Sequence, residues 1–193
     1  MFSVCVLIWV FFVGYFYVLH HPIHPTFKMP LTTLDQLISF NSLAIIPYLS
    51  LWIYLGAGPG LLLEYRELVS YGLWIGALCL TGLIFFYLFP TSVPPPEFNT
   101  SVHFGFSMLQ GVDTTSNACP SMHIATAMFT AIWVEHTLRY LSVPWGPRVL
   151  NLAWFMVIAY STLATKQHVI LDVLAGVILG SIFATASIYW RPK

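Results

Sequence analysis

The chain has 193 residues, of which 58% are hydrophobic and only 7% are charged. Soluble domains usually carry about 25% charged residues, so this composition predicts an integral membrane protein. The formal net charge is zero, which gives no sign of a nucleic-acid partner. The three cysteines, Cys5, Cys79 and Cys119, lack metal-type spacing, and their odd number gives no disulfide framework.

Long charge-free runs predict an all-α polytopic membrane protein, a single transmembrane domain over residues 1–193. One span needs about 20 apolar residues. Residues 1–19 lack the basic start and small-residue cleavage site of a signal peptide and are interpreted as a retained first span. Five further spans, the second kinked at Pro47, are expected at residues 36–63, 68–90, 120–134, 149–165 and 168–190. Gly176 and Gly180 in the last span are spaced for close helix packing.

Two segments outside these spans carry polar side chains. Three histidines lie between residues 20 and 24, but the prolines among them and the lack of a nearby acidic residue or cysteine favour a polar loop over a metal site. A proline-rich loop of about two dozen residues starts at Thr91, a length at which loops often serve function. Its His103 and Asp113 are expected to serve loop structure.

Basic residues predict the orientation of the chain. With both termini in the cytoplasm, five basic residues fall on the cytoplasmic side, against Lys28 and Lys166 outside, which fits the positive-inside rule. The same threading puts His123 and His168 on the extracytoplasmic face. The five cytoplasmic residues are Arg66, Arg139, Arg148, Arg191 and Lys193.

A cluster of ionisable residues beside the spans suggests phosphate-ester chemistry. His168 and Asp172 are four residues apart, so on a helix they share a face, and the carboxylate would orient the imidazole as a nucleophile. His123, in the first turn of the fourth helix, is suited to protonate a leaving alkoxide, because imidazole titrates near neutrality. Lys166 and the helix start at Ser121 supply positive charge and N–H donors for phosphate. This set needs neither metal nor cofactor.

Other classes of function remain open at this point. No serine is clearly placed for activation by His168, and Cys119, the nearest cysteine, is interpreted as a turn residue. Charges that gather at one end argue against a transport pathway through the bilayer. His123, His168 and Asp172 could instead ligate a transition metal, and activity that survives chelation would exclude this alternative. A purely structural role would leave the one-sided set unexplained.

Structural alternatives also exist for single residues. His168 and Asp172 could form a hydrogen-bonded pair at a helix end without chemistry. Lys166 could extend only to lipid headgroups, and Ser121 could only stabilise the start of its helix.

These motifs resemble the type 2 phosphatidic acid phosphatase superfamily. The segment Cys-Pro-Ser-Met-His that ends at His123 resembles its second signature, Pro-Ser-x-His. Ser161, His168 and Asp172 match the spacing of the third, which is Ser-Arg, five residues, His, three residues, Asp. The resemblance is specific over about residues 117–176. It implies a six-helix membrane fold whose site faces outward, with His168 as the nucleophile that becomes a phosphohistidine, Asp172 as its orienter and His123 as the general acid.

The chain departs from the family pattern in two places. The first signature, a Lys followed by Arg-Pro, is absent from the loop after the third span. In the third signature, Thr162 occupies the position of the Arg. Both missing groups normally bind phosphate, so Lys166, Ser121 and Thr162 are the expected substrate-binding residues. Branches that resemble inositol phosphorylceramide and sphingomyelin synthases show a similar loss. Hydrolysis of a lipid phosphate and transfer of a lipid headgroup therefore both stay open.

Overall fold

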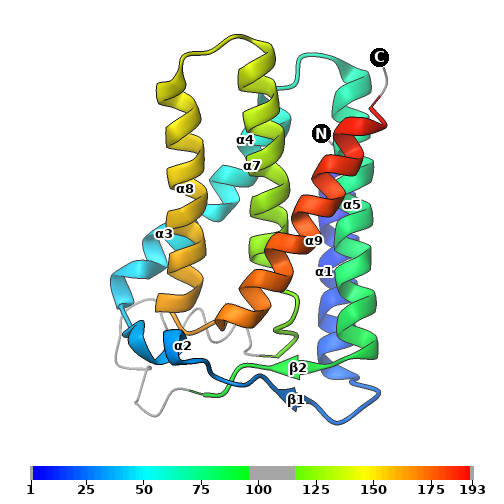
Figure 1. Ribbon diagram of the computed structural model, residues 1–193. Helices are drawn as coiled ribbons and strands as arrows, with labels where there is room; N and C mark the ends of the chain where they lie inside the picture. The colour runs from blue at the N-terminus through cyan, green and yellow to red at the C-terminus, as the bar shows by residue number, and fades with distance from the viewer. Residues whose placement is uncertain (1, 96–115, 192–193) are drawn as a thin grey trace.

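The structure, a computed structural model, describes residues 2–95 and 116–191, with side chains from Trp9 onward. The predicted loop residues His103 and Asp113 lie outside these ranges. The described chain is mostly helical, and its long helices form one bundle (Figure 1). In chain order the elements are α1 (Phe2–His20), β1 (Phe27–Lys28), α2 (Thr33–Leu37), η1 (Ser42–Ala44), α3 (Ile45–Leu49), α4 (Leu51–Gly60), α5 (Tyr65–Leu88), β2 (Thr91–Ser92), α7 (Met122–Tyr140), α8 (Trp145–Ala164) and α9 (Ile170–Tyr189).

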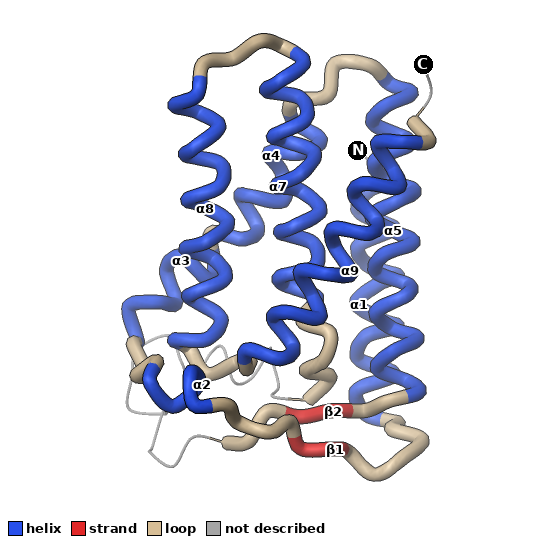
Figure 2. Tube along the Cα trace, in the orientation of Figure 1, coloured by secondary structure: helices blue, strands red, loops and turns tan. Residues whose placement is uncertain are grey.

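One pair of two-residue strands departs from the all-α expectation. β1 and β2 pair in parallel, with Phe27 opposite Thr91 and Lys28 opposite Ser92. Figure 2 shows the pair at the end of the bundle where α2 also lies. The pairing ties the segment that follows α1 to the segment that follows α5.

The second predicted span is not one helix. After the short α2, the chain turns and forms η1, α3 and α4 over residues 42–60. Pro47 lies inside α3 and has no N–H to donate, and α3 gives way to α4 at Ser50, three residues later. The Gly-Pro-Gly run ends α4 at Gly60, close to the expected position. The segment before residue 42 folds over one end of the bundle, where the N–H of Asn41 donates to the carbonyl of Ala164 at 3.0 Å.

Among the residues that the structure describes, three helical stretches are long and apolar enough to cross a membrane, namely Ser42–Gly60, Tyr65–Leu88 and Ile170–Tyr189. They support a membrane protein, whereas the predicted six spans are not confirmed. α7 continues past the predicted end at residue 134 and takes Glu135 and Arg139 into the helix, which lowers its apolar character. It packs against α4, α5, α8 and α9, so protein rather than lipid covers most of it.

α7 and α9 pack closely along an extensive contact. An ideal Cβ built on Gly176 would lie only 2.5 Å from the backbone oxygen of Ser121, and one on Gly180 would collide with the backbone oxygen of Ala125. Only glycine allows this approach of the two helices, which confirms the predicted packing face.

The two ends of the bundle differ in what they carry. The start of α1, the end of α9 and the connections α4–α5 and α7–α8 lie at one end (Figure 1). The strand pair, α2, the start of α7 and the loop before α9 lie at the other end. This second end holds the predicted site residues.

Candidate active site

His168 lies in the loop between α8 and α9, two residues before α9 begins at Ile170. The prediction that it shares a helix face with Asp172 is therefore wrong. The two side chains meet nevertheless, with His168 Nδ1 3.0 Å from Asp172 Oδ2, because Asp172 in the first turn of α9 points back over the loop. Asp172 is fully buried, and its Oδ1 accepts the N–H of Val169 at 2.7 Å. One carboxylate thus caps the start of α9 and also holds the imidazole of His168 in place.

The opposite side of the loop is held by α8. The N–H of His168 donates to the carbonyl of Thr162 at 3.2 Å, as does that of Gln167. His168 is only 7% exposed. Its backbone and its ring are therefore both fixed.

His123 occupies the first turn of α7, as predicted. Pro120 precedes the helix instead of opening it, and Ser121 is the N-cap, whose Oγ accepts the N–H of Ile124 at 3.4 Å. The N–H of Ser121 donates to the backbone oxygen of Asp172 at 3.0 Å, which joins the start of α7 to the first turn of α9. This junction brings His123 Nδ1 to 3.3 Å from His168 Nε2.

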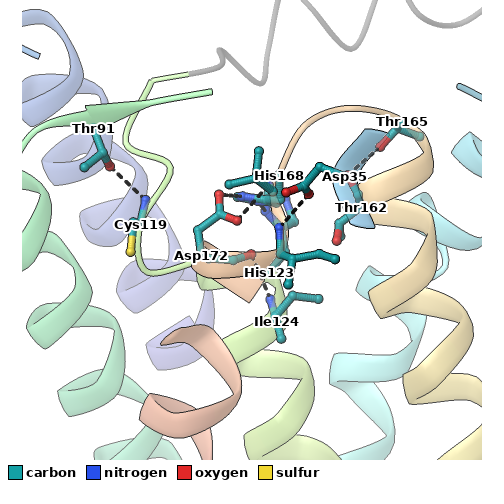
Figure 3. Close-up of polar contacts among 12 residues, drawn as sticks. Asp35, Thr91, Cys119, His123, Ile124, Thr162, Thr165, His168 and Asp172 are labelled. Carbon is teal, nitrogen blue, oxygen red and sulfur yellow. Dashed lines mark hydrogen bonds and ion pairs between the residues drawn. The ribbon is translucent and has the colours of Figure 1, made fainter. Parts of the chain in front are cut away.

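The three predicted catalytic residues therefore form one line of contacts (Figure 3). A carboxylate only accepts hydrogen bonds, so a neutral His168 donates from Nδ1 to Asp172 and keeps a lone pair on Nε2. A ring nitrogen with a lone pair is a nucleophile, and the second imidazole beside it is suited to deliver a proton. The structure brings the three side chains together; their roles stay predictions.

The three predicted substrate-binding residues have protein partners in the structure. Lys166 Nζ donates to the carbonyls of Asp35, at 3.0 Å, and Ile38. Partial burial lowers the pKa of Lys166, against the opposing effect of the Asp35 carboxylate. Thr162 is fully buried and its Oγ1 donates to the carbonyl of Ala159 at 2.9 Å, while Ser121, also buried, caps α7. Phosphate contacts of these residues stay predictions.

Sequence reasoning missed two side chains that contact the site. Asp35 is buried, and its Oδ1 accepts the N–H of Ile170 at 2.8 Å while its Oδ2 accepts the N–H of Thr32 at 2.8 Å. The hydroxyl of Tyr48 lies 2.9 Å from His123 Nε2. Asp35 had a signal, because it is the single acidic residue among the first 63 and stands three residues after Thr32, at capping-box spacing. Nothing in the sequence distinguishes Tyr48 from the other nine tyrosines.

Cys119 lies beside the cluster in the turn that precedes α7. Its backbone N–H donates to Thr91 Oγ1 at 2.8 Å (Figure 3). Burial raises the pKa of the Cys119 thiol, and the Asp172 carboxylate adds to the effect. A thiol that stays protonated is a poor nucleophile, which supports the interpretation of Cys119 as a turn residue.

In the comparison with protein families, the family model of the PAP2 superfamily matches residues 69–193. The match includes His123, His168 and Asp172 and begins within α5, so Asp35 and Tyr48 lie outside it. Comparisons with curated proteins and with solved structures returned no match. Membership suggests phosphatase or phosphotransferase activity. Because the matched residues make up more than half of the chain, the protein belongs to the PAP2 superfamily.

Proposed function

We propose that the protein is an integral-membrane lipid-phosphate phosphatase that hydrolyses a phosphomonoester or diphosphate lipid without a metal. The observation that carries this proposal is the alignment of Asp172, His168 and His123 through contacts of 3.0 and 3.3 Å. It leaves His168 Nε2 with a lone pair and puts a second imidazole where a leaving oxygen would need a proton.

In the first step His168 Nε2 attacks phosphorus and the bond from phosphorus to the lipid oxygen breaks. The imidazolium of His123 gives its Nδ1 proton to that oxygen, so the lipid alcohol leaves and a phosphohistidine remains. Asp172 stabilises the positive charge that develops on the ring of His168 through the bond to Nδ1.

In the second step water attacks phosphorus. His123, now neutral, takes a proton from this water, and the electrons of the N–P bond return to His168 Nε2. Inorganic phosphate leaves, and both imidazoles regain their starting protonation. Lys166, partly buried in the loop that also carries His168, adds positive charge for the phosphate oxygens in this proposal.

The expected setting is one membrane domain over residues 1–193, with the site facing the extracytoplasmic side. Two observations support this setting. The site lies at the end of the bundle opposite the start of α1 and the end of α9 (Figure 1). Basic residues are more numerous at that opposite end of the predicted threading.

A lipid headgroup phosphotransferase that resembles inositol phosphorylceramide or sphingomyelin synthases is the second candidate. It is favoured by the absence of the first signature, a loss that this branch shares. Both reactions use the same phosphoenzyme and differ in whether water or an alcohol accepts the phosphoryl-bearing group.

The test is phosphate release from a panel of lipid phosphates by the purified protein in detergent, with EDTA present and with or without alcohol acceptors. We expect release that needs His168 and ignores both EDTA and acceptors. A new phospholipid that forms only with an acceptor would indicate the transferase, and loss of activity in EDTA would contradict metal independence. No turnover of any lipid would overturn both candidates.

A further inference from the structure

Tyr48 contacts the site from a part of the chain that the family match does not reach. It lies in α3 with only 3% of its side chain exposed, and Phe40 and Ile45 pack against it. Its hydroxyl is 2.9 Å from His123 Nε2, and the centres of the two rings are 5.0 Å apart. A buried phenol held in this way fixes the position of the imidazole it touches.

The contacts that link Asp172, His168, His123 and Tyr48 indicate that a proton lies on Nδ1 of His123. Because Asp172 only accepts, His168 keeps its lone pair on Nε2, and the neighbouring Nδ1 of His123, 3.3 Å away, carries the proton that this lone pair accepts. His123 Nε2 then faces the hydroxyl of Tyr48. The phenol donates to Nε2 when a neutral ring carries its proton on Nδ1, and it accepts from Nε2 whenever Nε2 is protonated, so one hydroxyl serves every protonation state of the ring.

We propose that Tyr48 is a positioning residue that keeps Nδ1 of His123 directed at the oxygen that leaves phosphorus in the first step and at the water that attacks phosphorus in the second. The inference rests on the phosphatase function proposed above. In the first step the imidazolium of His123 loses its Nδ1 proton to the leaving lipid oxygen and keeps the proton on Nε2, which donates to the Tyr48 oxygen. In the second step the free Nδ1 takes the proton of the attacking water, and Tyr48 still holds Nε2.

This role predicts a dependence on the leaving group that a purely structural role would not give. Proton delivery by His123 matters most when the leaving alkoxide is strongly basic. Tyr48→Phe removes the hydroxyl and keeps the packed ring. Phosphate release from hexadecyl phosphate is expected to fall roughly 10- to 100-fold, up to the lower limit of the effect typical of general acid catalysis, because His123 itself is still present. Release from an analogue with two fluorine atoms on the carbon next to the CH2–O group should fall much less, because its alkoxide leaves more easily.

Tyr54→Phe is the matched control. It makes the same change in α4, where the buried hydroxyl of Tyr54 donates to Asn151 Oδ1 at 2.7 Å, away from the histidines. This variant should change both rates equally or not at all. His123→Ala should show a difference between the two esters in the same direction as Tyr48→Phe, but a larger one.

Rates of the four proteins on the two esters decide the question. A Tyr48→Phe loss that is equal for both esters, or no loss at all, would overturn the positioning role while leaving the phosphatase function in place. No phosphate release from any lipid phosphate, hexadecyl phosphate included, by the wild-type protein would overturn the phosphatase function and this inference with it.

Discussion

Gly176→Ala is expected to separate the two halves of the site. A Cβ at this position would lie 2.5 Å from the backbone oxygen of Ser121, whereas ordinary contacts begin at 3.4 Å, so α7 and α9 must move apart by roughly 0.9 Å. The N–H of Ser121 also binds the backbone of Asp172, which couples this movement to the contact of His123 with His168.

The magnitude follows from this displacement. Overpacking of a tight interface costs about 1–3 kcal/mol of unfolding free energy. A misplacement of about 1 Å in a reacting group can cost about 10²-fold in rate. Thermal unfolding in detergent and phosphate release from lipid phosphate measure the two effects on the same preparation.

Gly76→Ala is the control, because a Cβ built on Gly76 in α5 has no atom within 4 Å. It should leave the unfolding temperature and the rate close to those of the wild-type protein. If Gly176→Ala is as stable and as active as Gly76→Ala, the close approach of α7 and α9 does not hold the site together, and the reasoning is refuted.

Three further substitutions test separate parts of the account. Asp172→Asn puts an amide N–H2 beside either Val169 N–H or His168 Nδ1–H and should lower phosphate release on the order of 10²–10⁴-fold, so a rate near wild type would contradict the orienting role. Asp35→Ala leaves the N–H of Ile170 without its carboxylate and should lower the unfolding free energy by about 1–3 kcal/mol, whereas Glu64→Ala, at an exposed position with no side-chain cap bond, should not. Trp133→Phe removes the bond to Ser187 Oγ at 2.7 Å and should cost about 1 kcal/mol of stability in thermal unfolding while kcat/KM on lipid phosphate stays unchanged.

The sequence was sufficient to predict that His123, His168 and Asp172 come together, because the two motifs lie at the starts of α7 and α9. His123 lies in the first turn of α7 as expected. Asp172 lies in the first turn of α9, because this helix begins at Ile170 and not at His168 as expected. His168 lies before the helix, since the chain passes from α8 to α9 through a short loop in which Lys166 has a positive φ of 58°. Spacing alone does not show that the His–Asp contact crosses a helix cap instead of following a helix face.

The segment before α4 escaped prediction for a different reason. A charge-free run of suitable length predicts a span, but hydrophobicity does not report where such a run bends. Pro47 suggested a kink, whereas the separation of α2 depends on tertiary bonds from Asp35 to Ile170 and from Asn41 to Ala164. Contacts between residues far apart in the sequence leave no periodic signal, which is also why the contact of Tyr48 with His123, 75 positions later, was not anticipated.

The phosphoenzyme is the most direct test of the central claim. Purified protein would be mixed with the lipid phosphate that it turns over best, stopped rapidly at alkaline pH and analysed by mass spectrometry for phosphate bound to histidine. The account predicts acid-labile phosphate on His168, none in His168→Ala, and loss of phosphate release in that variant. Turnover that continues in His168→Ala, or phosphate on a different residue, would contradict the account.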